Sequence, residues 1–381
     1  MNKNLLMLVI IGILVIGIGS LTLTGNTVQK QSPIKVGFIG PLTGTPSVWG
    51  LGAKNLVELA TTEINSQGGI NGRILEVVYE DGKCGPKDAV NAANKLIQVD
   101  GVKFILGGHC SPETTAIVPI VDKNKVFLLA GITSSDGAVD GSNYAFRTSP
   151  PTIENAEKIA EIAIKKYKTI SLLTEQAAYS KSMSVDVKKS FEKFGGKVLS
   201  EDEYPPEQTD FRTQLLKIKE QNPNALFFSP QTPNSAILIL KQMKELNLNL
   251  PVFSNTIPIT KEVYTQSDKG FDETAFSVTP YADKTKKEAF ELSQKYKEKF
   301  GTDIPYNFFY VASTYDAVYM LKQALVKCGE DTDCVKDYFK TINYDGVTMN
   351  FRFKENGDPY FNSWAEMRVI NGEQVLKPLN N

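Results

Sequence analysis

Short apolar runs alternate with longer amphipathic runs along the chain after residue 33. In the first of the longer runs, Leu56, Val57, Ala60 and Ile64 recur at the spacing of one helix face, and the run stops at glycines 68–69. The short apolar runs that predict strands cover residues 34–39, 75–80, 103–106 and 126–130. Strands that alternate with helices in this way predict βαβ units around a parallel sheet.

The same rhythm begins again after Pro150. The strands predicted there cover residues 169–173, 197–200, 225–229 and 252–254. A chain of 381 residues is too long for one core, so we expect an α/β protein with two doubly wound parallel-sheet lobes joined by a hinge. We assign residues 33–149 and about 281–353 to lobe 1, and residues 150–280 and about 354–381 to lobe 2. The stretch 148–151 is the expected first crossing, and a strand at 351–353 is expected to lead the chain back.

Residues 1–32 are predicted to be an export segment followed by a linker. Lys3 precedes an apolar stretch, residues 5–23, which contains no acidic or basic side chain. Two interpretations remain: a cleaved signal peptide, or an uncleaved membrane anchor, which we favour because no A-x-A-like site follows. The first cysteine is Cys84, so a lipid-modified cysteine directly after the stretch is excluded. Either interpretation places the remaining chain outside the cell.

The four cysteines are an even number in a chain predicted to be exported, where thiols become oxidised. Cys328 and Cys334 lie six residues apart in a polar stretch and are expected to pair, which leaves Cys84 for Cys110. The alternative is a zinc site, but the spacings are wrong for one and His109 is the only histidine. We therefore expect two disulfides and no metal.

Charge and motifs argue against several other classes of protein. The net charge is −1 and no basic run could follow a phosphate backbone, so we expect no nucleic-acid partner. The sequence contains neither a P-loop nor a dinucleotide fingerprint. His109 follows an extended segment, where it should point away from Cys110, so that no Cys–His dyad forms. We expect no cofactor and no enzymatic activity.

Ligands of open parallel sheets bind beyond the carboxyl ends of the strands. Six loops satisfy this rule: residues 40–50, 107–112, 131–135, 175–180, 230–234 and 255–258. In the second loop, Ser111 is the expected N-cap of a helix with Pro112 at its first position, so that a ligand carboxylate could lie there; alternatively, Ser111 only caps the helix. Trp49 and Tyr179 could enclose an apolar ligand side chain or pack against their own lobes, and Tyr306 is a weaker candidate in an aromatic cluster.

Three motifs carry a family resemblance that runs from about residue 34 to the C-terminus: IKVGFIGPLTG at 34–44, INSQGGINGR at 64–73 and EDGKCGPKDAVNAANKLI at 80–97. With them the chain resembles the type I periplasmic binding proteins of leucine, isoleucine and valine transport. The resemblance implies a disulfide between Cys84 and Cys110. It also implies that Ser111 and Ser134 bind a ligand carboxylate and that the Ile132 carbonyl accepts from a ligand ammonium.

The same resemblance places Trp49 and Tyr179 around the ligand side chain. Two departures from the family pattern concern the second lobe. Thr256 occupies the approximate place of an acidic residue that pairs with the ammonium, and Gln231 stands where an aromatic residue is usual. Because a buried ammonium without a counter-charge is costly, either another acid such as Glu175 substitutes or the ligand is not a standard α-amino acid.

We therefore expect an extracytoplasmic solute-binding protein of an ABC importer, which closes on a small amino-acid-like ligand and then docks on a membrane ABC permease. One alternative is a sensory ectodomain that signals through a partner protein. A further alternative is a binder of a small amide or carboxylate that has no ammonium group. The protein is expected to be a monomer that contacts the membrane only through its N-terminal segment.

Overall fold

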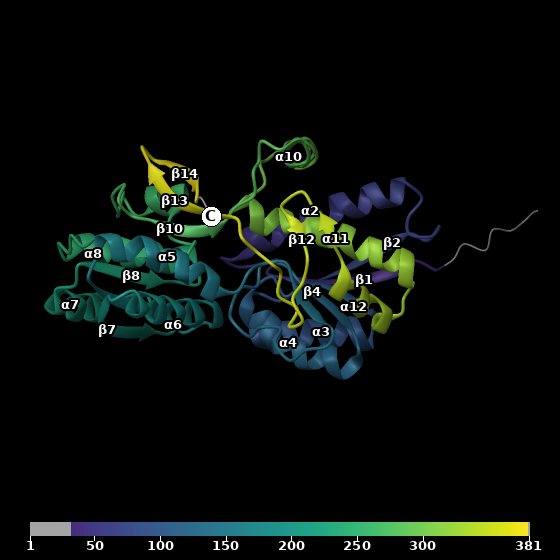
Figure 1. The fold of residues 1–381 in the computed structure, drawn as a ribbon, viewed down its shortest axis with the longest axis horizontal. Coiled ribbons are helices and arrows are strands. Elements are labelled where there is room, and N and C mark those ends of the chain that lie inside the picture. The colour runs from purple at the N-terminus through teal and green to yellow at the C-terminus, as the bar shows by residue number, and fades with distance from the viewer. Residues whose placement is uncertain (1–31, 380–381) are drawn as a thin grey trace, which may run out of the picture. The chain divides into compact units, whose positions relative to one another are not determined.

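The computed structural model describes residues 32–379 and contains two parallel sheets, one in each lobe (Figure 1). The first sheet has the order β2-β1-β3-β4-β5, and every neighbouring pair is parallel. Its strands are β1 (Ile34–Gly40), β2 (Leu75–Asp81), β3 (Phe104–Gly107), β4 (Phe127–Ala130) and β5 (Ala145–Arg147). The second sheet has the order β7-β6-β8-β9, again parallel. Its strands are β6 (Thr169–Glu175), β7 (Lys197–Tyr204), β8 (Ala225–Ser229) and β9 (Val252–Ser254). The predicted fold class is confirmed.

Helices pack on both faces of the first sheet, as the alternation of side chains along a strand requires. Phe104 and Leu106 of β3 belong to the hydrophobic core that includes residues of α2 (Ser47–Ser66) and α11 (Phe308–Cys328). Ile105 packs in a core with residues of α3 (Pro86–Gln98) and α4 (Ser111–Asn124). The helices of this lobe are α2 (Ser47–Ser66), α3 (Pro86–Gln98), α4 (Ser111–Asn124), α10 (Lys287–Phe300), α11 (Phe308–Cys328) and α12 (Thr332–Thr341). Those of the other lobe are α5 (Thr152–Lys166), α6 (Ala178–Lys193), α7 (Arg212–Gln221), α8 (Pro233–Glu245) and α9 (Lys261–Gln266).

Three segments carry the chain between the lobes, and they lie after β5, after β10 (Ser277–Pro280) and before β13 (Trp364–Ile370). The backbone N–H of Ser254, at the end of β9, donates to the Phe276 carbonyl at 3.1 Å, which extends the second lobe toward β10. The strands β10, β13 and β14 (Glu373–Pro378) form an antiparallel sheet beside it. Contacts unite Pro33–Asn381 in one unit, so the predicted residue boundaries between the lobes stay a prediction.

The strand expected at 351–353 is wrong as the element that leads the chain back to the second lobe. In the structure β12 (Asn350–Phe351) pairs only with β11 (Tyr344–Asp345), in a two-stranded sheet of its own. Phe351 and Phe353 are buried in the core of the first lobe, which accounts for the apolar pattern that resembled a strand. The returning strand is β13.

The predicted export segment, residues 5–23, lies outside the residues that the structure describes. Between residues 32 and 379, no helix is long and apolar enough to cross a membrane.

Two acidic side chains meet beside the first crossing. The Thr152 hydroxyl lies 3.1 Å from Asp136 Oδ1 and 2.7 Å from Asp186 Oδ2. It also lies 2.5 Å from the Ser182 hydroxyl. Because a hydroxyl has one hydrogen, Thr152 cannot donate to both carboxylates at once. Burial, together with the neighbouring Asp136 charge, raises the pKa of Asp186 from 3.8 to about 7.

This raised pKa predicts how stability varies with pH. The folded protein keeps a proton on Asp186 that the unfolded chain releases above pH 3.8, so the free energy of unfolding should fall as the pH rises from about 4 to about 7. Asp186→Asn removes the free-energy cost of ionising this buried carboxyl group at high pH. We expect its Tm to match the wild type near pH 4 and to exceed it at pH 8, by about 1 to 2 °C for each kcal/mol recovered.

Scanning calorimetry from pH 4 to pH 8 measures this difference. The matched control is Asp337→Asn, which removes an exposed carboxylate of α12 and should leave the Tm difference close to zero at every pH. A Tm advantage of Asp186→Asn that is equally large at both ends of the range would contradict the prediction.

Candidate ligand-binding site

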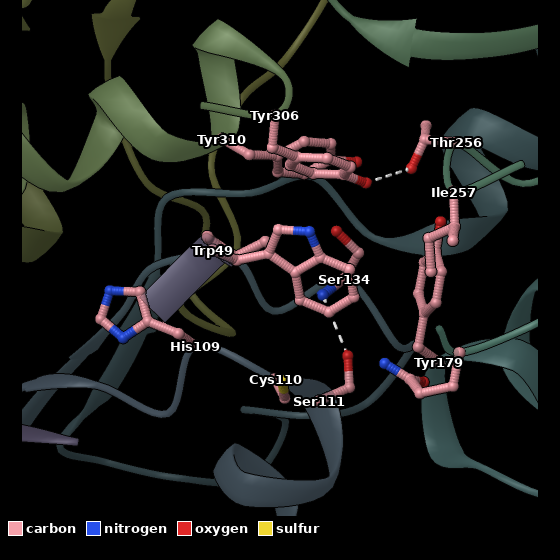
Figure 2. A pocket seen from close by; sticks show the side chains of 12 residues that line it. Trp49, His109, Cys110, Ser111, Ser134, Tyr179, Thr256, Ile257, Tyr306 and Tyr310 are labelled. Atoms are coloured by element: carbon pink, nitrogen blue, oxygen red, sulfur yellow. Dashed lines mark hydrogen bonds between the residues drawn. The ribbon is translucent and has the colours of Figure 1, made fainter. Parts of the chain in front are cut away.

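A cavity of about 30 Å³ lies where the carboxyl ends of the strands in the two lobes meet (Figure 2). Twelve residues line it: Trp49, His109, Cys110, Ser111, Ile132, Ser134, Tyr179, Gln231, Thr256, Ile257, Tyr306 and Tyr310. Eight of them are the residues predicted from the sequence to bind ligand: Trp49, Ser111, Ile132, Ser134, Tyr179, Gln231, Thr256 and Tyr306. The structure thus places all eight residues around one cavity. Their contact with a ligand stays a prediction.

The turn between β3 and α4 positions Ser111. Gly107 has a φ of +137° and a Cβ there would lie 2.1 Å from the Ile39 carbonyl oxygen, so only glycine allows the chain to leave β3 at this angle. The expectation that Ser111 is the N-cap is wrong. The helix already includes Ser111, and the preceding Cys110, held in an extended conformation, is the N-cap. Glu113 completes the cap, because its Oε2 accepts from the Cys110 N–H at 3.1 Å.

Because Ser111 lies inside the helix, its hydroxyl does not cap the helix, and it lines the cavity instead. Its oxygen accepts hydrogen bonds from the backbone N–H groups of Ser134, at 3.2 Å, and of Ser135, at 3.1 Å. A serine oxygen has two acceptor lone pairs, and both are occupied by these contacts. The hydroxyl hydrogen of Ser111 can therefore donate to an acceptor atom of a ligand.

Three buried polar atoms of the cavity wall have no hydrogen-bond partner among residues 32–379. They are Trp49 Nε1, Ser134 Oγ and Gln231 Oε1. An unpaired buried polar group costs about 1 to 3 kcal/mol. Trp49 can only donate and Ser134 can donate or accept, so a ligand with acceptor atoms would recover part of that cost.

Aromatic rings from separate parts of the chain form the apolar part of the wall. The ring centroids of Trp49 and Tyr306 are 5.4 Å apart, and those of Tyr306 and Tyr310 are 6.2 Å apart. The Tyr306 hydroxyl also lies 2.8 Å from Thr256 Oγ1, which joins the start of α11 to the loop after β9 in the other lobe. In Figure 2, Tyr179 stands beside Thr256 and Ile257, on the second-lobe side of the cavity.

Sequence reasoning missed Tyr310, the most informative of the four additional lining residues. It lies in the first turn of α11, four residues after Tyr306, which precedes the N-cap Asn307, and the aromatic cluster at 306–310 is the signal that could have found it. Almost every residue in the first three turns of α11 is buried, so the pattern alone did not distinguish the turn that faces the cavity from the turns that face the core.

The cavity wall carries no net charge at neutral pH. Burial lowers the pKa of His109 to about 4, so its imidazole is neutral, and Nδ1 lies 2.9 Å from the Ile39 carbonyl, to which it donates. Burial also raises the pKa of Tyr179 to about 12 and that of Tyr310 well above its ordinary value. The remaining lining residues have apolar, hydroxyl or amide side chains.

Glu175 does not take the place of an acid in this wall. It lies in a neighbouring groove of about 730 Å³ between the lobes, and its Oε2 accepts from the Gln231 backbone N–H at 2.9 Å. The Tyr204 hydroxyl donates to the same oxygen at 3.3 Å. Burial raises the pKa of Glu175. Its position therefore does not support the alternative that Glu175 pairs with a ligand ammonium.

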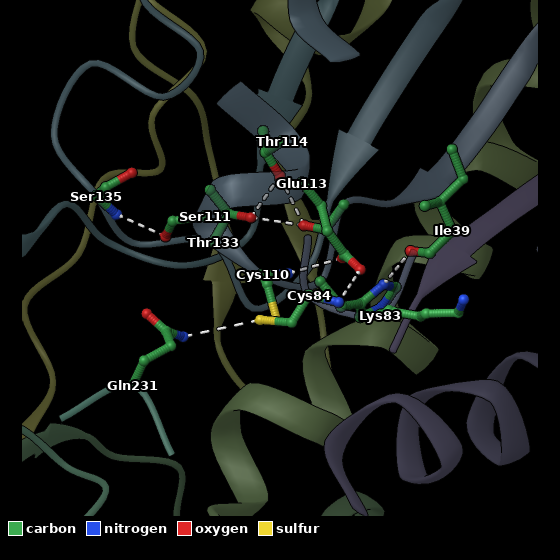
Figure 3. Close-up of a disulfide and its surroundings, with 12 residues drawn as sticks. Ile39, Lys83, Cys84, Cys110, Ser111, Glu113, Thr114, Thr133, Ser135 and Gln231 are labelled. Atoms are coloured by element: carbon green, nitrogen blue, oxygen red, sulfur yellow. Dashed lines mark hydrogen bonds between the residues drawn. A yellow bond between two sulfur atoms is a disulfide. The ribbon is translucent and has the colours of Figure 1, made fainter. Parts of the chain in front are cut away.

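Both disulfides that the sequence predicts are present and join Cys84 to Cys110 and Cys328 to Cys334. The first borders the cavity, and Gln231 of the second lobe points at it, with Nε2 3.8 Å from Cys84 Sγ (Figure 3). Since Cys110 is disulfide-bonded, it forms no dyad with His109. In the described part of the chain, no cluster of three or more histidine, cysteine or acidic side chains could hold a metal ion.

Comparisons with known proteins agree with this architecture. The family model described as "Periplasmic binding protein" matches residues 33–373. A leucine-, isoleucine-, valine-, threonine- and alanine-binding protein of Pseudomonas aeruginosa is 28% identical over 329 residues, which cover 85% of this chain and 87% of that protein. A Leu/Ile/Val-binding protein of Rhizobium johnstonii is 27% identical over 81% of this chain and 84% of its own.

Solved structures match over nearly the whole chain. A leucine-binding protein from Thermotoga maritima has a TM-score of 0.82 at 24% identity and covers 91% of this chain and 99% of its own. A solute-binding protein of an ABC transporter from R. palustris, in complex with benzoate, has a TM-score of 0.79 at 18% identity and covers 92% of this chain and 98% of its own. At these identities the likeness concerns the fold alone.

Proposed function

This chain belongs to the family of periplasmic binding proteins, and on that premise we propose that it is an extracytoplasmic solute-binding protein of an ABC importer. It captures a small, amino-acid-like carboxylate between its lobes and delivers it to an ABC permease. The observation that carries this proposal is the cavity itself. Side chains from both lobes close it, and one wall offers hydrogen-bond donors at the start of α4.

The carboxylate of the ligand would lie against Ser111 and Ser134. The Ser111 hydroxyl has its acceptor sites occupied and can only donate, and the partly positive N-terminal end of α4 favours an anion. Ser134 Oγ and Trp49 Nε1 are buried without partners and are available to the same group. Charge-assisted hydrogen bonds of this kind are about twice as strong as neutral ones.

Capture requires that the lobes move. A cavity of about 30 Å³ holds no more than about two water molecules, so a larger solute has to enter while the lobes are apart. Contacts that join the lobes, such as the 2.8 Å hydrogen bond between Thr256 and Tyr306, would form on closure and favour the closed form.

The remaining expectations about this protein follow from the same proposal. The relatives bind solutes, and the site here has a neutral buried histidine and disulfide-bonded cysteines in place of a nucleophile with its base, so we assign no enzymatic activity. We propose that the protein acts outside the cell membrane, as a monomer, and that residues 5–23 hold it there or direct its export.

A thermal-shift screen of residues 32–381, followed by calorimetry, tests the proposal. We expect stabilisation of several degrees by a subset of amino acids and small carboxylates, because a ligand that binds only the folded state raises its stability. X-ray scattering with and without the best compound should then show a smaller radius of gyration in the complex. Absence of binding across the panel, or unchanged scattering at saturation, would refute capture by lobe closure.

A further inference from the structure

We infer that the solute is a small monocarboxylate with an apolar or aromatic body and no charged amino group. This inference rests on the proposed function and narrows it from amino-acid-like carboxylates to one class. Two properties of the cavity wall carry it: the wall is rich in hydrogen-bond donors, and all its side chains are uncharged.

The cavity wall offers hydrogen-bond donors that are free for a ligand. Ser111 can only donate, since two N–H groups occupy its oxygen, and Trp49 Nε1 is a donor with no partner. The unpaired Ser134 hydroxyl, which can donate or accept, adds a third group able to donate. The unpaired side-chain atom that can only accept is Gln231 Oε1. This inventory fits a ligand whose polar end is an acceptor, as a carboxylate is.

An ammonium group has the opposite needs. It donates three hydrogen bonds and accepts none, and its charge is strongly disfavoured in a buried site without an anion. Here it would find the Gln231 amide oxygen and the Ile132 carbonyl, which are both neutral. Neither provides a counter-charge, whereas a carboxylate beside Ser111 would lie against the partly positive N-terminal end of α4.

The two buried carboxyl groups near the cavity are already engaged elsewhere. Glu113 accepts from the Cys84 N–H through Oε1, at 2.9 Å, and from the Cys110 N–H through Oε2, behind the disulfide (Figure 3). Glu175 accepts from the Gln231 N–H and faces the neighbouring groove. Neither carboxyl group lines the cavity, so an ammonium bound there would contact neither of them.

The rest of the wall suits an apolar body. The rings of Trp49, Tyr179, Tyr306 and Tyr310 line the cavity together with Ile257. Such rings pack against aliphatic or aromatic groups, and they could also surround a quaternary ammonium, which needs no hydrogen-bond acceptor. The test therefore includes a betaine.

The experiment compares pairs of compounds that differ only in the amino group. Wild-type protein is titrated in a calorimeter with leucine and 4-methylpentanoate, with phenylalanine and 3-phenylpropanoate, and with glycine betaine. We expect at least one deaminated acid to bind 10-fold or more tighter than its amino acid and than glycine betaine. Tighter binding of the amino acid in both pairs, or of the betaine, overturns the inference and leaves the proposed function intact. If none of these compounds binds, the inference fails, and the wider thermal-shift panel decides whether the proposed function stands.

A substitution tests the same idea in reverse. Thr256 lines the cavity on the second-lobe side, so Thr256→Glu places a carboxylate in the wall. We expect the ratio of leucine affinity to 4-methylpentanoate affinity to rise at least 10-fold. Gln221→Glu, which adds the same charge at an exposed position at the end of α7, should leave the ratio unchanged. An unchanged ratio in a folded Thr256→Glu protein contradicts the inference, and the wild-type titrations decide the matter if that variant does not fold.

Discussion

Replacing Ser111 and Ser134 together by alanine is expected to weaken carboxylate binding by about 3 kcal/mol or more, which is at least about 100-fold in Kd. The Ser111 hydroxyl can only donate, and Ser134 Oγ is buried without a partner. The double variant would leave a buried carboxylate without two of its donors. Calorimetric titration with 4-methylpentanoate and with leucine measures the loss.

Ser135→Ala is the matched control for the double variant. Ser135 is buried in the same loop and its backbone N–H contacts Ser111, but its side chain is outside the cavity wall. Its Kd should stay within about threefold of wild type. Circular dichroism melting curves of each variant separate loss of binding from loss of folding. Unchanged affinity in a folded double variant would remove both serines from the site.

Asp358→Ala is expected to lower the free energy of unfolding by about 3 to 5 kcal/mol, because it leaves a buried guanidinium without its counter-charge. Arg147 is 0% exposed, and its Nε donates to Asp358 Oδ1 at 2.6 Å. Its Nη1 donates to the Ser135 carbonyl at 2.6 Å. Urea denaturation measures the stability, with the m-value as a check on two-state unfolding.

An exposed ion pair provides the control for this variant, and ligand binding provides a second measurement. Asp210→Ala breaks an exposed ion pair with Arg212 and should leave the free energy of unfolding close to that of the wild type. Arg147 also donates to the carbonyl of Ser135, the residue after Ser134. We therefore expect Asp358→Ala to weaken ligand binding as well, although Asp358 itself does not line the cavity. A loss of stability no larger than that of Asp210→Ala would show that the buried pair is not needed.

Local patterns in the sequence identified eight of the nine strands of the two parallel sheets and missed β5, which has only three residues. Side chains alternate across a strand and recur every 3.6 residues on a helix, so runs such as residues 34–39 identify their element without reference to distant parts of the chain. The rule that ligands bind at the carboxyl ends of parallel strands then selected loops that supply Trp49, Ser111 and Gln231 to one cavity. The parity of the cysteines and the short spacing of one pair indicated both disulfides.

Local patterns failed where the same run of residues is compatible with two different structures. The apolar residues 351–353 fill a core without forming a strand of a main sheet, and the extended Cys110 moves the helix cap one residue earlier than Ser111. Tyr310 belongs to a helix that is buried nearly all round, so its cavity-facing side has no periodic signature.

The sequence by itself determined the fold class, the disulfide pairs and the loops that meet at the cleft, because each depends on neighbours along the chain or on a general rule of parallel sheets. Only the tertiary structure decided how the polar groups of the cavity are arranged. It showed that backbone N–H groups 23 and 24 residues away occupy the Ser111 oxygen. It also showed that Glu175 faces a different groove and that Arg147 pairs with a residue 211 positions later. Such contacts depend on how distant segments pack in three dimensions, and the local periodicity of the sequence does not predict that packing.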